Sequence, residues 1–186
     1  MRPAATQRLI DRYDGMRALL DSAMTAGPSV HTVAAEAAPI LEAEARLLDA
    51  GAYAAWLALY AEDAYLWIPA HPDDHPGRDQ ALAFDDRRRL SERARHMGDP
   101  QAWAITAPAP ITVRQLGPIA AWATPGGGIV ATATLTVTHV RRGPAQVLHG
   151  RQVFSLEHQG GSLLISAKIL VFPELALGAL NIGWVI

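Results

Sequence analysis

The chain has 186 residues, half of them hydrophobic, a formal net charge of −2 and no cysteine. This length suits one core, and the balanced charge without a basic block predicts no nucleic-acid partner. The missing cysteine excludes disulfides, thiolate nucleophiles and a cysteine-ligated iron–sulfur cluster within this chain. Neither end of the sequence carries the unbroken apolar stretch of a signal peptide or membrane span, so we expect a cytoplasmic protein without a membrane partner.

Helices are predicted for the first part of the chain. The first follows the possible N-cap Thr6 and ends near Gly27, and its apolar residues recur at helical spacing. That apolar stripe consists of Leu9, Tyr13, Met16 and Leu20. Pro39 lacks a backbone donor, so we expect a turn before it and a second helix from Pro39 to Asp49.

The middle of the chain alternates between helix and strand signals. A helix is expected from Tyr53 to Ala61, followed by a short aromatic strand from Tyr65 to Ile68. The prolines and aspartates of His71–Gly77 predict a loop, and Asp85–Met97 returns to a helix rich in arginine.

Strands are predicted after Trp103. Their expected ranges are Ile111–Trp122, Ile129–Arg141, Gln146–His158 and Leu163–Phe172, separated by glycine-containing turns. Along the second strand, apolar residues alternate with the threonines of Thr132–Thr138, so one face should meet helices and the other water or another subunit. Helices followed by an antiparallel meander predict an α+β fold, in which a curved sheet wraps around helices.

Three groups of residues resemble the β subunits of aromatic-ring-hydroxylating (Rieske-type) dioxygenases. The first is Glu44–Asp49 with Tyr53, Trp56-Leu57, Tyr60 and Tyr65–Pro69, a pattern shared with the wider NTF2-like (SnoaL-like) superfamily. The second, more specific group is Asp85-Asp86, Leu90, Arg93, Met97, Ala102–Ala104, Thr112 and Arg114. The third is Gly150-Arg151, Leu163–Val171 and Leu180–Ile182. The sequence departs from the family at Pro108–Arg114, where an arginine-rich run is usual, and at His96 and Pro118.

This resemblance implies an NTF2-like (cystatin-like) cone at residues 39–186, preceded by a helical extension at residues 1–38. It implies a non-catalytic β subunit that joins other copies of itself and a separate α subunit in an α3β3 assembly. The α subunit would hold the Rieske [2Fe–2S] cluster, the mononuclear iron and the substrate, and would use O2 and NAD(P)H to dihydroxylate an aromatic ring. No metal, cofactor or catalytic residue is then expected in this chain. The interface candidates are Trp103, Arg114, Thr134, Thr136, Arg151 and Asn181.

Two other functions stay open on the sequence. A stand-alone NTF2-like dehydratase or isomerase would need a histidine and a carboxylate that converge in the cone. The pocket candidates for that enzyme are Tyr65, Trp67, His71 and His139. A small-molecule binding protein would instead have an apolar cavity without paired titratable groups. The cluster His71–His75 contains metal-ligand types, but its flanking prolines prevent the helical turn that would align two histidines, so we expect a solvated loop.

Overall fold

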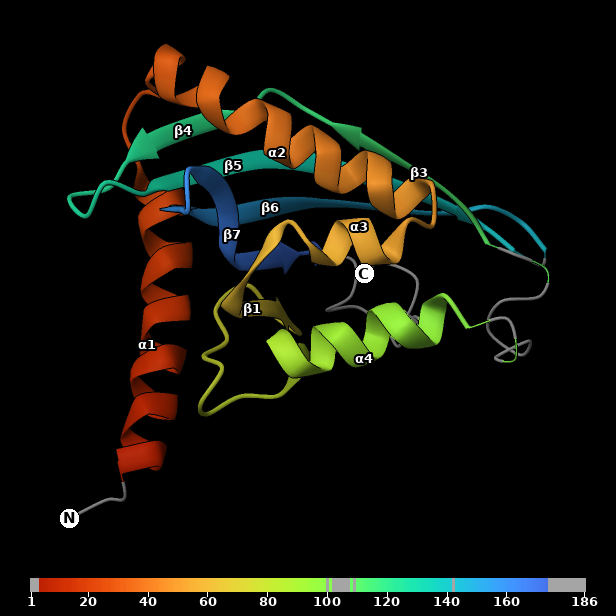
Figure 1. The fold of residues 1–186 in the computed structure, drawn as a ribbon, viewed down its shortest axis with the longest axis horizontal. Coiled ribbons are helices and arrows are strands. Elements are labelled where there is room, and N and C mark those ends of the chain that lie inside the picture. Colours follow the sequence, from red (N-terminus) through yellow and green to blue (C-terminus); the bar gives the residue numbers. More distant parts are fainter. Residues whose placement is uncertain (1–3, 100, 102–107, 109, 142, 174–186) are drawn as a thin grey trace.

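The computed structural model describes residues 4–99, 101, 108, 110–141 and 143–173 (Figure 1). Its helices are α1 (Ala4–Thr25), α2 (His31–Asp49), α3 (Tyr53–Leu57) and α4 (Arg87–Met97). Its strands are β1 (Tyr60–Pro69), β2 (Ala81–Asp86), β3 (Ile111–Leu116), β4 (Ala120–Ala123), β5 (Ile129–Val140), β6 (Gln146–Gln159) and β7 (Ser162–Val171). Within this part of the chain, no helix is long and apolar enough to cross a membrane. The predicted α+β class is confirmed.

The strands form one seven-stranded sheet in the order β2-β1-β7-β6-β5-β3, with β4 also paired to β5. All pairs are antiparallel except β1 with β7. The tight connections contain glycines with positive φ, namely Gly127 in the β4–β5 turn and Gly160-Gly161 in the β6–β7 turn. Glycine adopts this conformation without the steric cost of a Cβ, which fixes the register of the predicted meander.

Two layers of helices cover the two faces of the sheet. The inner face packs against α2, α3 and α4 and contains the main core, whose large members include Trp56, Leu66 and Phe154. On the outer face α1 runs across one end of the sheet and contacts β5, β6 and β7 (Figure 1). There Met16 and Leu20 of its predicted apolar stripe are buried in a second cluster, whereas Leu9 is exposed.

Helix α2 differs from the prediction because it begins at His31 and runs through Pro39. The expected start at Pro39 was therefore wrong. Pro39 is exposed, and the buried positions of α2, which begin at Ala37, define the side of the helix that faces the sheet. Packing of that apolar side outweighs the one backbone hydrogen bond that a proline cannot donate. The expected boundary between residues 38 and 39 falls inside this helix.

Two strand predictions also need correction. Residues Ala81–Asp86 form strand β2 along β1, so the next helix begins at Arg87 rather than at Asp85, with Asp86 as its N-cap. The single strand expected over 111–122 is split into β3 and β4. Gly117 lies at the break, pressed against Thr134 so closely that a Cβ there would collide with the Thr134 hydroxyl oxygen.

Candidate functional site

The inner face of the sheet contains a buried charge cluster centred on Glu44 of α2. One carboxylate oxygen, Oε1, accepts hydrogen bonds from the Lys168 ammonium at 2.5 Å, the Trp56 indole N–H at 2.9 Å and the Tyr60 hydroxyl at 3.0 Å. All four side chains are almost completely buried. We call these four residues the interior cluster.

Local structure explains why these residues meet. Glu44 lies on the buried side of α2, and Trp56 and Tyr60 follow on α3 and at the start of β1. Lys168 lies in the middle of β7, where its cross-strand neighbours are Phe154 and Leu66. The ammonium also lies 5.4 Å from the centre of the Phe154 ring. A lysine that faces the core must find a carboxylate, because an uncompensated buried charge is costly.

Burial and the contacts within the interior cluster shift the pKa values of its titratable groups. Burial pushes the pKa of Glu44 upward, but the Lys168 charge and the donors around it outweigh burial and hold that pKa below its ordinary value. Burial lowers the pKa of Lys168, and the pair with Glu44 only partly offsets that effect. Burial and the Glu44 charge raise the pKa of Tyr60 well above its ordinary value, so its hydroxyl stays a donor.

A second buried ion pair joins the last residue of α2 to strand β3. The Arg114 guanidinium contacts Asp49 at 2.5 Å, and the backbone N–H of Arg114 donates to the other Asp49 carboxylate oxygen at 2.7 Å. Only 3% of the Arg114 side chain is exposed. Arg114, an interface candidate from the sequence, therefore lies on the inner face and is bound within the chain. At the opposite edge of the sheet, Arg93 pairs with the buried Asp85 at 2.6 Å.

These contacts link four elements of the fold through one carboxylate oxygen. Three donors saturate Glu44 Oε1, and each donor belongs to a different element, so the interior cluster ties α2, α3, β1 and β7 together. Catalysis by Glu44 would require breaking one of these buried hydrogen bonds.

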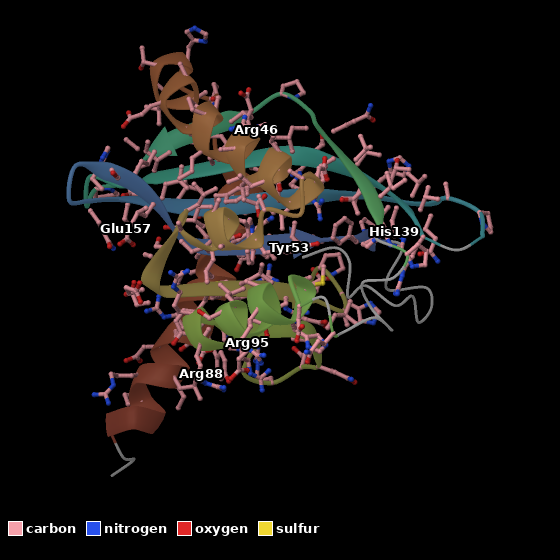
Figure 2. The ribbon with its side chains drawn as sticks, turned by 45° about the vertical axis from the view of Figure 1, so that its right-hand side comes forward. Arg46, Tyr53, Arg88, Arg95, His139 and Glu157 are labelled. Atoms are coloured by element: carbon pink, nitrogen blue, oxygen red, sulfur yellow. The ribbon has the colours of Figure 1, made fainter. Side chains whose placement is uncertain are left out.

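The structure does not bring the dehydratase candidates together. Tyr65 and Trp67 lie on the outer face, packed in the cluster beneath α1. His71 is exposed in the β1–β2 connection. His139 is on the inner face, where burial lowers its pKa and the charged groups that act on it are both arginines, Arg141 and Arg114. Figure 2 shows His139 and Glu157 at opposite ends of the sheet, with Glu157 near the end that α1 crosses.

The loop between β1 and β2 is attached to α1. His75 Nε2 lies 3.0 Å from Asp14 Oδ1, and the Arg17 guanidinium donates to the carbonyls of Pro72 and Asp74 at 2.7 and 3.0 Å. No three His, Cys, Asp or Glu side chains converge as metal ligands anywhere in the described ranges. His75 and two backbone carbonyls of this loop thus hold it against α1.

A groove of about 420 Å³ lies on the outer face, between α1 and strands β6 and β7. Arg12 and Gly15 line one wall, and Ser155, Glu157 and Ser166 line the other. The Ser166 hydroxyl is already hydrogen-bonded to Ser155. The groove is lined by both a cation and an anion, and its serine hydroxyls are hydrogen-bonded to each other. Its lining therefore does not indicate one class of ligand.

The part of the outer face that α1 leaves uncovered is formed by β3, β5 and β6. We call it the open face, and it comprises Ile111, Val113, Gln115, Thr134, Thr136, Thr138, Val140, Val147, His149 and Arg151. Three of the interface candidates, Thr134, Thr136 and Arg151, lie on it. Two others, Trp103 and Asn181, lie outside the described residues.

Sequence reasoning missed the pairing of Glu44 with Lys168. Glu44 was noticed only as part of a family-like motif, and Lys168 was included in an apolar strand. The signal was the lysine itself, since a single cation inside the run Leu163–Val171 indicates a buried partner. The sequence could not say which carboxylate, because the two residues are 124 positions apart.

Comparisons with known proteins agree with this fold. The family model described as ring hydroxylating beta subunit matches residues 43–174. The β subunit of benzoate 1,2-dioxygenase from Burkholderia mallei superposes with a TM-score of 0.65 at 21% identity, covering 80% of this chain and 95% of that one. Naphthalene 1,2-dioxygenase with indole bound in its active site gives 0.70 at 19% identity, covering 94% of both chains.

The same fold also occurs in a protein that is not named as a dioxygenase subunit. ActVI-ORFA from Streptomyces coelicolor gives a TM-score of 0.57 at 16% identity, covering 75% of this chain and 96% of that chain. No curated protein matches the chain in sequence. At these sequence identities, similarity to solved structures establishes the fold but not the function. The predicted NTF2-like architecture is confirmed.

Proposed function

Since the chain belongs to the ring hydroxylating β-subunit family, we propose that it is the non-catalytic small subunit of an aromatic-ring-hydroxylating dioxygenase. The observation that carries the proposal is the family match over residues 43–174, which spans the chain from the middle of α2 to the end of β7. Members of this family associate with an α subunit, and we propose an α3β3 assembly in the cytoplasm.

In that assembly the α subunit carries the Rieske cluster, the mononuclear iron and the aromatic substrate. Electrons from NAD(P)H and one molecule of O2 then serve the dihydroxylation of the ring in the α subunit. The role of this chain is to supply a rigid, folded base. The interior cluster supports that role, because its acid and base groups are bound to each other and not to an open pocket.

The first test is co-expression of the chain with the large-subunit gene that neighbours it, followed by measurement of mass and iron content. The expected result is an equimolar complex of hexameric mass that contains iron, whereas this chain purified alone contains none. A chain that purifies free of any large subunit would contradict the proposal.

A second test addresses the absence of catalysis in this chain. The double variant Glu44→Gln/Lys168→Met removes both charges of the interior cluster but keeps an oxygen that accepts from Trp56 and Tyr60. Per assembled complex, we expect its turnover to match that of the unsubstituted protein within about twofold. A loss of turnover in a complex of unchanged mass and iron content would instead assign chemistry to this cluster.

A further inference from the structure

Lys168 of the interior cluster is the single lysine among the 16 lysine and arginine residues of the chain. The others are all arginines, whose guanidinium groups stay protonated and are poor nucleophiles. A lysine amine that has lost its proton, in contrast, attacks acyl groups and is the usual target of acylation. Lys168 is thus the one side-chain amine that an activated acyl donor can modify.

The fold withholds this amine from solvent. The Lys168 side chain is 2% exposed, and its ammonium lies 2.5 Å from Glu44 Oε1 and 5.4 Å from the centre of the Phe154 ring. An acyl donor can reach Nζ only if α2 and α3 leave the sheet, and both helices contribute to the main core. Burial also lowers the pKa of Lys168, so lack of access, rather than permanent protonation, protects the amine. Exposure of Lys168 therefore requires extensive unfolding.

An acylated Lys168 does not fit the folded interior. In the reaction the ammonium first gives a proton to solvent, Nζ then bonds to the carbonyl carbon of the donor, and the leaving group and a second proton depart. The product is a neutral amide, so Glu44 loses its counter-ion and keeps only neutral donors. The acyl group also needs space beside Trp56 and Phe154, which are 1% and 0% exposed in the main core.

We infer that Lys168 is a modification site of the unfolded chain alone. An activated acyl donor, such as a thioester or an acyl phosphate, acylates it before folding or after unfolding, and the product cannot return to the native fold. Folding therefore protects the only lysine by pairing it with Glu44, and the folded chain presents just its terminal α-amino group to the same donors.

The first measurement compares acylation of the folded and the unfolded chain. The purified chain is treated with the N-hydroxysuccinimide ester of acetic acid, in buffer and in urea, and acetyl groups are located by intact mass and peptide mapping. We expect acetylation of the α-amino group alone in buffer, and of Lys168 as well in urea. Arg46→Lys supplies an exposed reference amine on α2 (Figure 2). In the folded chain this reference should react at least about 100-fold faster than Lys168, which reacts only through unfolding.

The second measurement tests whether the modified chain refolds once the ester is quenched and the urea is removed. The chain acetylated on Lys168 should not regain its native circular dichroism and tryptophan fluorescence. Two controls carry only the terminal acetyl group and should refold: the unsubstituted chain acetylated in buffer and then passed through urea, and the double variant Glu44→Gln/Lys168→Met acetylated in urea.

Three results would overturn the inference. The first is acetylation of Lys168 in the folded chain as fast as that of the Arg46→Lys reference, because the fold would then give no protection. The second is native refolding of the chain that carries an acetyl group on Lys168, because the modification would then be compatible with the interior cluster. The third is failure of the unsubstituted chain acetylated in buffer to refold, because the loss would then come from the treatment and not from Lys168.

Discussion

The interior cluster can be dissected by a double-mutant cycle on Glu44 and Lys168. Lys168→Met removes the ammonium and leaves a buried carboxylate with only two neutral donors, Trp56 and Tyr60. Glu44→Gln keeps an oxygen for those donors but leaves the Lys168 ammonium without its counter-ion. Each single substitution should therefore lower the free energy of unfolding by about 3–5 kcal/mol, the range for breaking one side of a buried ion pair.

The double variant should be much more stable than the sum of the singles. It contains no charge at this site, and the amide oxygen that replaces the carboxylate still accepts from the indole and phenol groups. Its remaining cost is the unsatisfied amide N–H group, about 1–3 kcal/mol. Additive behaviour would predict roughly 6–10 kcal/mol instead, as twice the single-site cost. The coupling energy is thus large enough to measure with confidence.

Urea unfolding followed by circular dichroism and tryptophan fluorescence gives the four free energies of the cycle. In thermal unfolding, each single substitution should lower Tm by roughly 6–20 °C, at about 2–4 °C per kcal/mol for a chain of this size. Single variants within about 1 kcal/mol of the unsubstituted protein would refute the reasoning, as would a double variant that loses the sum of both. The first result would mean that water or relaxation compensates the unpaired buried charge, and the second that Glu44 and Lys168 do not stabilise the fold through each other.

Three further predictions use the same measurement. Folding lowers the pKa of Glu44, so the stability that the ionised carboxylate gives the fold is complete above the ordinary value of 4.5 and is lost as the pH falls through the folded value. The unfolding free energies of the unsubstituted protein and the double variant should therefore converge in acid. A constant difference between about pH 7 and about pH 3 would contradict this expectation. Gly150→Ala should cost on the order of 1–3 kcal/mol, since a Cβ there would lie 2.5 Å from a backbone oxygen, whereas the matched Gly126→Ala, with no atom within 4 Å, should be almost neutral. Leu20→Ala should lower the free energy of unfolding by about 2–5 kcal/mol, because it leaves a cavity beneath α1. The matched Leu9→Ala changes an exposed residue and should lower it by less than about 0.5 kcal/mol. Equal losses would show that α1 does not pack on the sheet through its buried stripe.

The strands of the meander could be predicted closely because two local signals coincide there. In β5 the alternation of threonine with apolar residues follows the period of a strand, and glycines end the neighbouring strands at positions where φ is positive. Strand β2 gave no such signal. Its sequence ends in Asp85-Asp86, and it becomes a strand because it pairs with β1, a contact that local propensity does not encode.

The first half of α2 and the interior cluster were missed for a related reason. Pro39 opposes a helix locally, and only the packing of the buried side of α2 on the sheet decides the outcome. Likewise, Lys168 is visible in the sequence as a cation in an apolar strand, but its partner is set by how α2 lies over the inner face of the sheet. Tertiary contacts of this kind cannot be read from periodicity.

Charged side chains have different partners on the two faces of the sheet. This difference distinguishes the charges that stabilise the fold from the charge that is available to an interface. On the inner face, Glu44 with Lys168, Asp49 with Arg114 and Asp85 with Arg93 are each paired within the chain, so none of these charges requires a partner protein. On the open face Arg151 is exposed beside apolar residues and has no such ion pair among the described residues. A charge that the fold does not need is one that an interface can use, whereas a charge that the fold has already neutralised cannot be exposed without loss of stability.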